Sequence, residues 1–188
     1  GKMGYAIARA CIRRGAEVIL ISGPSCLEQP HGLKSFFRVE TAQEMRNAMF
    51  KNLTKTDVVI MAAAPADFSP EKKEKTKINK TDKLLVNLRN TPDILSEMGK
   101  LKNKPLLVGF AAETGERLDR AKKKLIQKNA DIIVFNNVTA VGSGFDVDTN
   151  EITIIRKNKE LSLPLMTKDA AAEAILDAVS DILNKQTG

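Results

Sequence analysis

Two groups of lysines have the types and spacing that could do chemistry on an anionic substrate. Lys124 and Lys128 lie four residues apart, so on a helix they share one face, which is either solvated or turned to a site. The other group lies in a charged stretch between Pro65 and Asp82 that shows no stable periodicity. That stretch is either a solvated loop or a flap that carries its basic side chains over a triphosphate. Its lysines are Lys72, Lys73, Lys75, Lys77 and Lys80.

Two further features are consistent with a nucleotide or phosphate ligand. Asp67 is the first charged residue after the apolar run 58–63 and serves either as a turn or cap residue or as a ribose, base or metal contact. Gly1-Lys2-Met3-Gly4 opens a predicted helix, whose free amides favour phosphate, although Gly4 could equally serve close packing. Intact P-loop and dinucleotide-binding glycine motifs are missing.

The sequence offers few residues for nucleophilic, metal or redox chemistry. His31 is the single histidine and is expected on the surface, so neither a zinc site nor a Ser-His-Asp triad can be assembled. Cys11 and Cys26 have no metal-ligand or redox spacing and are expected to be reduced thiols in a cytoplasmic protein. We therefore expect no metal held by protein side chains alone.

Composition narrows the class of partner. The 188 residues carry a net charge of +7, which suits nucleic acid, a membrane surface or small anionic substrates. Only 4% of the residues are aromatic, too few for a typical single-strand groove, and no apolar run is long enough to span a membrane. We expect small anionic substrates, and neither nucleic acid nor a membrane.

The elements that must position these residues alternate between helices and strands. Predicted helices cover 3–14, 92–101, 115–129 and 168–183, and a further helix is predicted to open at Thr41. Predicted strands cover 17–22, 36–39, 57–63, 84–88, 105–110 and 131–136, and 152–156 with 161–165 form a terminal β-hairpin. Thr41 and Glu44 form a predicted capping box, and the run 57–63 is expected to be buried on both faces.

This order predicts an α/β fold: one Rossmann-like, three-layer sandwich over residues 1–188 with a mostly parallel sheet. Because Gly1 leads directly into a helix, we expect the first strand to be missing and the domain to be truncated at its N-terminus. A basic flap is expected at about 68–82. Ligands of such sheets bind at the carboxyl ends of the strands.

Seven short segments, in order and spacing, resemble one family over essentially the whole chain: the phosphopantothenate-cysteine ligase domain of the bifunctional coenzyme A biosynthesis protein. Gly-Phe-Ala-Ala-Glu-Thr and the Lys-x-x-Lys flap are the most specific of them. The segments are Gly-Lys-Met-Gly at 1–4, Ser-Gly-Pro at 22–24, Ala-Ala-Ala-Pro-Ala-Asp at 62–67, Lys-Ile-Asn-Lys at 77–80, Thr-Pro-Asp-Ile-Leu at 91–95, Gly-Phe-Ala-Ala-Glu-Thr at 109–114 and Asn-Asn-Val at 136–138.

The resemblance implies a cytoplasmic enzyme that joins 4'-phosphopantothenate to L-cysteine with CTP and Mg²⁺. The carboxylate attacks the α-phosphorus of CTP, releasing pyrophosphate, and the cysteine amine then displaces CMP from the acyl-cytidylate. FMN is expected only if a fused phosphopantothenoylcysteine decarboxylase domain precedes the chain. The family is dimeric, and its flap is expected to cross the interface.

The same resemblance assigns site residues. Lys77 is implied to be the catalytic flap lysine, whereas the middle position of the family's Lys-x-Lys-Lys signature is Asn79 here. The family's asparagine that holds the acyl-cytidylate is expected upstream of Gly1. Besides Lys77, the implied nucleotide contacts are Met61, Ala62, Ala63, Asp67, Pro92, Asp93, Ile94, Leu95, Phe110, Lys124 and Lys128.

Two alternatives stay open on the residues alone. A nicotinamide- or flavin-binding oxidoreductase would want an acidic residue after the second strand, where Ser22-Gly23-Pro24 stands instead. A basic binding module would bind polynucleotides in a salt-sensitive manner and release no pyrophosphate. The choice of CTP over ATP rests on the resemblance.

Overall fold

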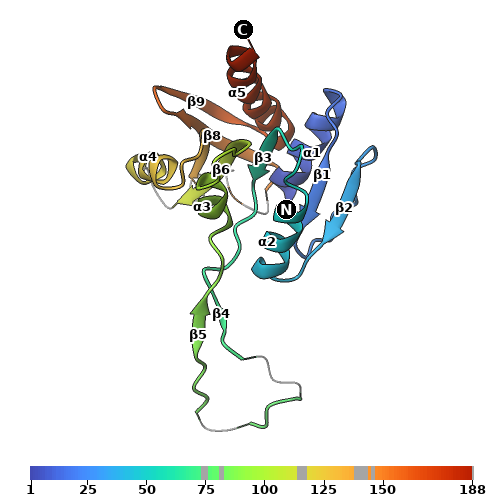
Figure 1. The fold of residues 1–188 in the computed structure, drawn as a ribbon, viewed down its shortest axis with the longest axis vertical. Coiled ribbons are helices and arrows are strands. Elements are labelled where there is room, and N and C mark those ends of the chain that lie inside the picture. Colours follow the sequence, from blue (N-terminus) through green and yellow to red (C-terminus); the bar gives the residue numbers. More distant parts are fainter. Residues whose placement is uncertain (73–75, 81–82, 114–117, 138–143, 145–146, 188) are drawn as a thin grey trace.

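The computed structural model describes residues 1–72, 76–80, 83–113, 118–137, 144 and 147–187. Five strands form the central sheet, in the order β3-β6-β7-β8-β9 (Figure 1). Strands β3, β6 and β7 are parallel, and β8 and β9 complete the sheet as an antiparallel hairpin. These strands are β3 (Val58–Met61), β6 (Leu106–Glu113), β7 (Ile132–Asn137), β8 (Thr149–Arg156) and β9 (Lys159–Thr167).

Helices cover both faces of this sheet. One core joins the faces of α1 (Lys2–Arg13) and α5 (Lys168–Thr187) to one side of the strands. The other core joins α2 (Ala42–Lys51), α3 (Ile94–Gly99) and α4 (Leu118–Gln127) to the opposite side. The predicted three-layer α/β sandwich is therefore confirmed.

Local sequence signals set several element boundaries as expected. Thr41 accepts the N–H of Glu44 at 3.1 Å, and the Glu44 carboxylate accepts the N–H of Thr41, so the predicted capping box begins α2. After α1, Gly15 has a φ of +80°, a conformation that glycine adopts without steric cost. The terminal hairpin is also confirmed, with both strands longer than predicted.

Two small sheets lie beside the central one. Strands β1 (Ile19–Ser22) and β2 (Ser35–Arg38) form a parallel pair, and no ladder joins them to β3 within the described part of the chain. Strand β3 is covered on both faces as predicted: Val58 and Ile60 pack against the α1-α5 core, and Val59 and Met61 pack in the other core, with Val59 the most deeply buried of the four. The third sheet is the antiparallel pair of β4 (Phe68–Pro70) and β5 (Leu88–Asn90).

The pair β4-β5 forms the base of an arm that extends away from the sandwich and comprises the described residues 68–72, 76–80 and 83–90 (Figure 1). The flap predicted at 68–82 overlaps the first part of this arm, and its residues 73–75 and 81–82 lie outside the described residues. The predicted strand 84–88 is wrong: pairing with β4 begins at Leu88, and the preceding residues Leu84, Leu85 and Val86 are exposed. An apolar run alone could not reveal that no sheet face covers it.

Candidate functional site at the carboxyl edge of the sheet

The carboxyl ends of β3, β6 and β7 lie along one edge of the sheet. Met61, the last residue of β3, pairs with Gly109, whereas β6 and β7 continue side by side to Glu113 and Asn137. The arm leaves the sandwich from this edge, after Met61, Ala62 and Ala63 (Figure 1). Ligands of open α/β sheets bind outside this edge, so it is the candidate site.

Close packing of α3 places its first turn against this edge. A side chain at Gly109 would lie 2.5 Å from Cδ2 of Leu95, so the absence of a Cβ there lets α3 approach β6. Ile94 and Leu95 are buried, and they anchor the helix in the second core. The helix begins at Ile94 rather than at Pro92, because Asp93 is its N-cap and accepts the N–H of Ser96 at 3.1 Å.

Helix α4 and the residue that directly follows it, Lys128, supply the two lysines expected on one face. The Nζ of Lys124 donates to the carbonyl oxygen of Phe110 at 2.7 Å. The Nζ of Lys128 forms an ion pair with the Asp93 carboxylate. Both cations are thereby drawn to the same side of the edge, where the Lys128–Asp93 pair is partly exposed to solvent.

Asp93 carries out two roles, because its two oxygens bind different partners. Burial by itself would raise the pKa of the carboxyl, but the hydrogen bonds from Lys128 and the Ser96 N–H outweigh burial and lower it. The carboxylate is therefore ionised at neutral pH, and it caps α3 while it holds Lys128.

The base of the arm is fixed to the site by two hydrogen bonds. Thr91 donates its N–H to the carbonyl oxygen of Asp67 at 2.9 Å, and its hydroxyl to that of Ala66 at 2.5 Å. The side chain of Asp67 is exposed beside this junction. Lys77 is also exposed, and it belongs to the arm, which extends away from the sandwich that holds α4 (Figure 1).

The opposite face of the edge is covered by the first turns of α1. A Cβ on Gly4 would lie 3.7 Å from the Cβ of Ala62, so this helix begins directly beside the end of β3. Its N-cap, Gly1, contributes no side-chain hydrogen bond to the helix. Ser22, at the end of β1, lies 3.0 Å from the hydroxyl of Tyr5, and no acidic residue occupies this strand end as the oxidoreductase alternative requires.

Sequence reasoning missed two polar residues at this edge. Asn136 near the end of β7 and Asn150 near the start of β8 are both buried and lie within hydrogen-bond distance of each other. The segment Asn136-Asn137-Val138 was a signal, but a pattern of residues does not show that the partner is Asn150, fourteen positions later.

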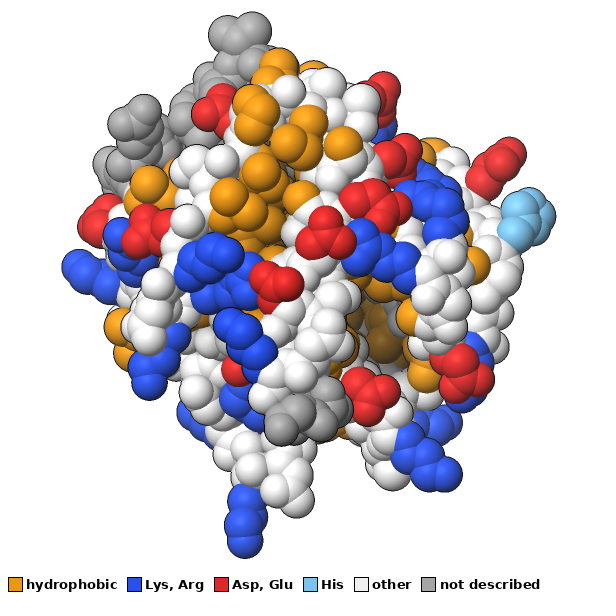
Figure 2. All heavy atoms as spheres, turned by 90° about the horizontal axis from the view of Figure 1, so that it is seen from above, with side chains coloured by type: hydrophobic (Ala, Val, Ile, Leu, Met, Phe, Trp, Pro, Cys, Tyr) orange, Lys and Arg blue, Asp and Glu red, His pale blue; other side chains and the backbone are white. Residues whose placement is uncertain are grey.

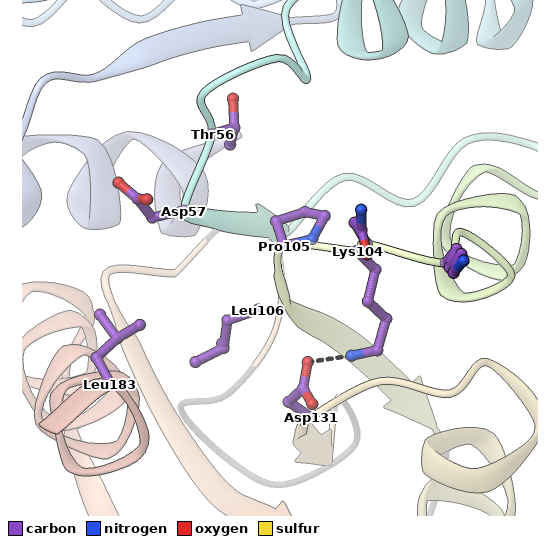
Figure 3. A pocket seen from close by; sticks show the side chains of 9 residues that line it. Thr56, Asp57, Lys104, Pro105, Leu106, Asp131 and Leu183 are labelled. Carbon is purple, nitrogen blue, oxygen red and sulfur yellow. Dashed lines mark hydrogen bonds and ion pairs between the residues drawn. The ribbon is translucent and has the colours of Figure 1, made fainter. Parts of the chain in front are cut away.

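A hollow of about 550 Å³ lies at the other end of the strands, where β3 and β6 begin (Figure 3). Its carboxylate Asp131 accepts hydrogen bonds from Lys104 at 2.6 Å and from the Leu107 N–H at 2.7 Å. These polar groups satisfy one another, and the amino ends of parallel strands are not where such sheets bind ligands. The hollow therefore does not compete with the carboxyl edge as a site.

Surface charge and side-chain clusters bear on three other possibilities: a polynucleotide-binding module, a metal site and a membrane-spanning helix. On the face opposite the arm, basic and acidic side chains are intermixed rather than gathered into one basic patch (Figure 2). Over the described residues, no cluster of three His, Cys, Asp or Glu side chains could hold a metal ion. Within the same residues, no helix is both long and apolar enough to cross a membrane.

Comparison with known proteins identifies the family. The profile of the family described as the DNA/pantothenate metabolism flavoprotein C-terminal domain matches residues 1–183. The chain belongs to this family. A crystal structure of the C-terminal domain of the coenzyme A biosynthesis bifunctional protein CoaBC is 39% identical, with a TM-score of 0.83 over 98% of this chain and 84% of that chain.

A longer curated relative and a more distant structure are also similar to this chain. The CoaBC protein of Bacillus subtilis is 46% identical over all of this chain but only 47% of its own length, so the chain spans about half of the curated relatives it matches. The fold is shared with a Cab2 mutant in complex with phosphopantothenate-cysteine, at 14% identity and a TM-score of 0.76 over all of this chain and 80% of that chain.

Proposed function

We propose that this domain is a phosphopantothenate-cysteine ligase of coenzyme A biosynthesis, which condenses 4'-phosphopantothenate with L-cysteine at the expense of CTP. The observation that carries the proposal is the pair of α4 cations, with Lys124 on the end of β6 and Lys128 on the first turn of α3. In a member of this family, such cations suit a reaction that brings several anionic groups together.

The chemistry requires charge neutralisation rather than a protein nucleophile. A carboxylate oxygen of phosphopantothenate attacks the α-phosphorus of CTP, and the bond to the bridging oxygen breaks, so pyrophosphate leaves. The amine of cysteine then attacks the acyl carbon, loses a proton as the amide forms, and displaces CMP. Lysine side chains and backbone amides stabilise the negative charge in both steps.

We assign the nucleotide to the α3-α4 side of the edge. Met61, the last residue of β3, packs against the core of this side and is partly exposed, whereas Ala62 and Phe110 pack against the α1-α5 core on the other face. Mg²⁺ would enter with the triphosphate, since it commonly keeps phosphate and water ligands and needs few protein carboxylates. Asp67, exposed at the same edge, is the nearest candidate for such a contact.

We further propose a homodimer in which the arm crosses to the partner subunit. The arm carries exposed apolar side chains, including Phe68, Leu84 and Leu85, the last 90% exposed. Apolar surface of this kind is expected to be covered. A second copy of the chain is the occupant that would also bring Lys77 to a nucleotide, since within one subunit the arm that carries Lys77 extends away from the sandwich that holds α4 (Figure 1).

The full-length gene product tests the activity directly. We expect pyrophosphate to be released only when CTP and 4'-phosphopantothenate are both present, and CMP to form in equal amount once cysteine is added. ATP in place of CTP tests the choice of base. Pyrophosphate release from CTP alone, or none with all three substrates, would refute the proposed reaction.

Light scattering on the same protein tests the assembly. A dimer that becomes a monomer in a Leu85→Asp variant supports the crossing arm, with Asn87→Asp, at an exposed position of the arm, as the control for one added negative charge. A wild-type monomer would refute it.

A further inference from the structure

Two buried asparagines and a methionine form a directional chain of hydrogen bonds behind the carboxyl edge. Asn136 is 8% exposed and Asn150 is 2% exposed. The Nδ2 of Asn136 donates to the Oδ1 of Asn150 at 3.4 Å, and the Nδ2 of Asn150 donates to the Sδ of Met3 at 3.6 Å. The chain therefore links the end of β7, the start of β8 and the first turn of α1.

The methionine fixes the direction of this chain. A thioether sulfur only accepts hydrogen bonds, so Asn150 must turn its NH₂ group toward Met3 and its oxygen toward Asn136. Asn136 must then donate its own NH₂ group to that oxygen. As a consequence the Oδ1 of Asn136 points away from Asn150, whereas a reversed amide would set two oxygens against each other.

This Oδ1 atom is buried and accepts no hydrogen bond in the described part of the chain. A buried acceptor without a donor destabilises a fold, and such atoms in native structures call for an explanation. The side chain lies on the sheet face of Ile132 and Val134, which is the face covered by α1. It is therefore on the α1 side of the candidate site, beside Ala112 of β6.

The backbone that carries Asn150 is held firmly. Lys168, at the start of α5, is only 6% exposed and donates its N–H to the carbonyl oxygen of Asp148 at 2.9 Å. Its ammonium group donates to the carbonyl oxygens of Gly144 and Val147. These bonds fix the segment immediately before Asn150, so Asn150 provides a rigid support for the Asn136 amide.

We infer that Asn150 is a positioning residue that holds the Asn136 amide with its oxygen toward the ligand, and that this oxygen accepts a hydrogen bond from an N–H or O–H group of a substrate. The inference rests on the proposed ligase function. An ionised phosphate or carboxylate cannot supply the proton, so Asn136 reads an amino, amide or hydroxyl group. Because the oxygen is covered in this structure, the substrate reaches it by displacing a neighbouring group.

Kinetics of matched variants test the positioning role. Asn150→Leu keeps the approximate volume and removes the relay, whereas Thr153→Val removes a hydrogen bond of 3.2 Å to Ser162 from a buried position on the same strand. In the full-length protein, we expect Asn150→Leu to raise KM for one substrate at least about tenfold, with Thr153→Val leaving every KM within twofold. Equal effects of the two variants on every KM would overturn the inference.

Side-chain amide NMR identifies the donor and is independent of turnover. In protein labelled with ¹⁵N-asparagine, the Asn136 signal is assigned by its loss in Asn136→Asp. We expect it to shift when one of CTP, L-cysteine or 4'-phosphopantothenate is added alone, and to lose this shift in Asn150→Leu. If the Asn136 signal shifts with none of the three compounds, the inference is refuted, even if wild-type protein releases pyrophosphate. A shift with CTP in a protein that forms no product would support the inference while refuting the proposed function.

Discussion

The Nζ atom of Lys124 lies 2.7 Å from the carbonyl oxygen of Phe110, which joins α4 to the carboxyl end of β6. One turn later, Lys128 is paired with Asp93 at the start of α3. A single helix thus delivers two cations to one strand edge, and each is oriented by a different acceptor. This arrangement is the basis of the first two predictions.

Replacing Lys124 by methionine should weaken CTP binding while the fold is kept. The change removes one charge-assisted hydrogen bond and a cation beside the proposed position of the triphosphate, so we expect Kd for CTP to rise about tenfold or more. Isothermal titration of the full-length protein measures it. Lys123→Met is the matched control, because Lys123 is exposed on the same helix. If the two variants bind CTP with the same affinity, Lys124 is not part of the nucleotide site.

Asp93→Asn should reduce stability at neutral pH but not in acid. The pKa of Asp93 is lower in the folded chain than its ordinary value of 3.8, so its contribution is complete above that value and is lost as pH falls through the folded pKa. Asparagine retains the cap, and the carboxylate is half exposed, so the loss at pH 7 should be about 0.5–1 kcal/mol. Urea unfolding at pH 7 and pH 3 measures it. A difference that persists undiminished at pH 3 would contradict the role of the ion pair.

Gly99→Ala should destabilise the folded chain, whereas Gly4→Ala should leave its stability unchanged or raise it slightly. A Cβ at Gly99 would lie 2.0 Å from the backbone oxygen of Lys128, so α3 and α4 would have to separate, at a cost of about 2 kcal/mol or more. At Gly4 the nearest atom is the Cβ of Ala62 at 3.7 Å, and alanine favours the helix, so stability should be unchanged or slightly higher. Thermal unfolding of both variants decides, and a tolerated Gly99→Ala would mean that α3 does not pack as described.

Lys77→Ala should abolish turnover without affecting folding, and the defect should be rescued in trans. If the arm acts on the partner's site, a mixture of Lys77→Ala with an inactive Lys124→Glu variant contains dimers with one intact site. Random mixing should then restore about a quarter of wild-type activity, because half of the dimers are mixed and each has one complete site of two. The pyrophosphate assay measures it, and a mixture no more active than its components would place Lys77 outside the partner's site.

The two cysteines should differ in reactivity. Burial raises the pKa of the Cys11 thiol, whereas Cys26 is exposed. Because the thiolate is the reactive form, iodoacetamide at pH 8 should modify Cys26 well before Cys11. Mass spectrometry of timed samples measures this, with urea-unfolded protein as the control in which both react alike. Faster modification of Cys11 would contradict its position in the α1 interface.

Local sequence determined most of the elements and their order. Apolar periodicity placed the helices, and short buried runs such as Leu106–Val108 placed the parallel strands, because burial on a sheet face selects these side chains wherever they occur. The capping box at Thr41 is confirmed for the same reason, since both of its partners lie within one turn. The α4 lysines were foreseen as a pair because a helix has a fixed repeat.

Tertiary structure alone decided which side chains meet. Asp93 and Lys128 are 35 positions apart in the sequence, and Asn136 and Asn150 are 14 apart, so no local sequence pattern predicts that either pair is in contact. The arm shows the same limit, because Leu84, Leu85 and Val86 have a strand-like composition but no sheet to cover them. Spacing along the chain sets local conformation, whereas hydrogen bonds and ion pairs between distant residues depend on how packed layers bring their edges together.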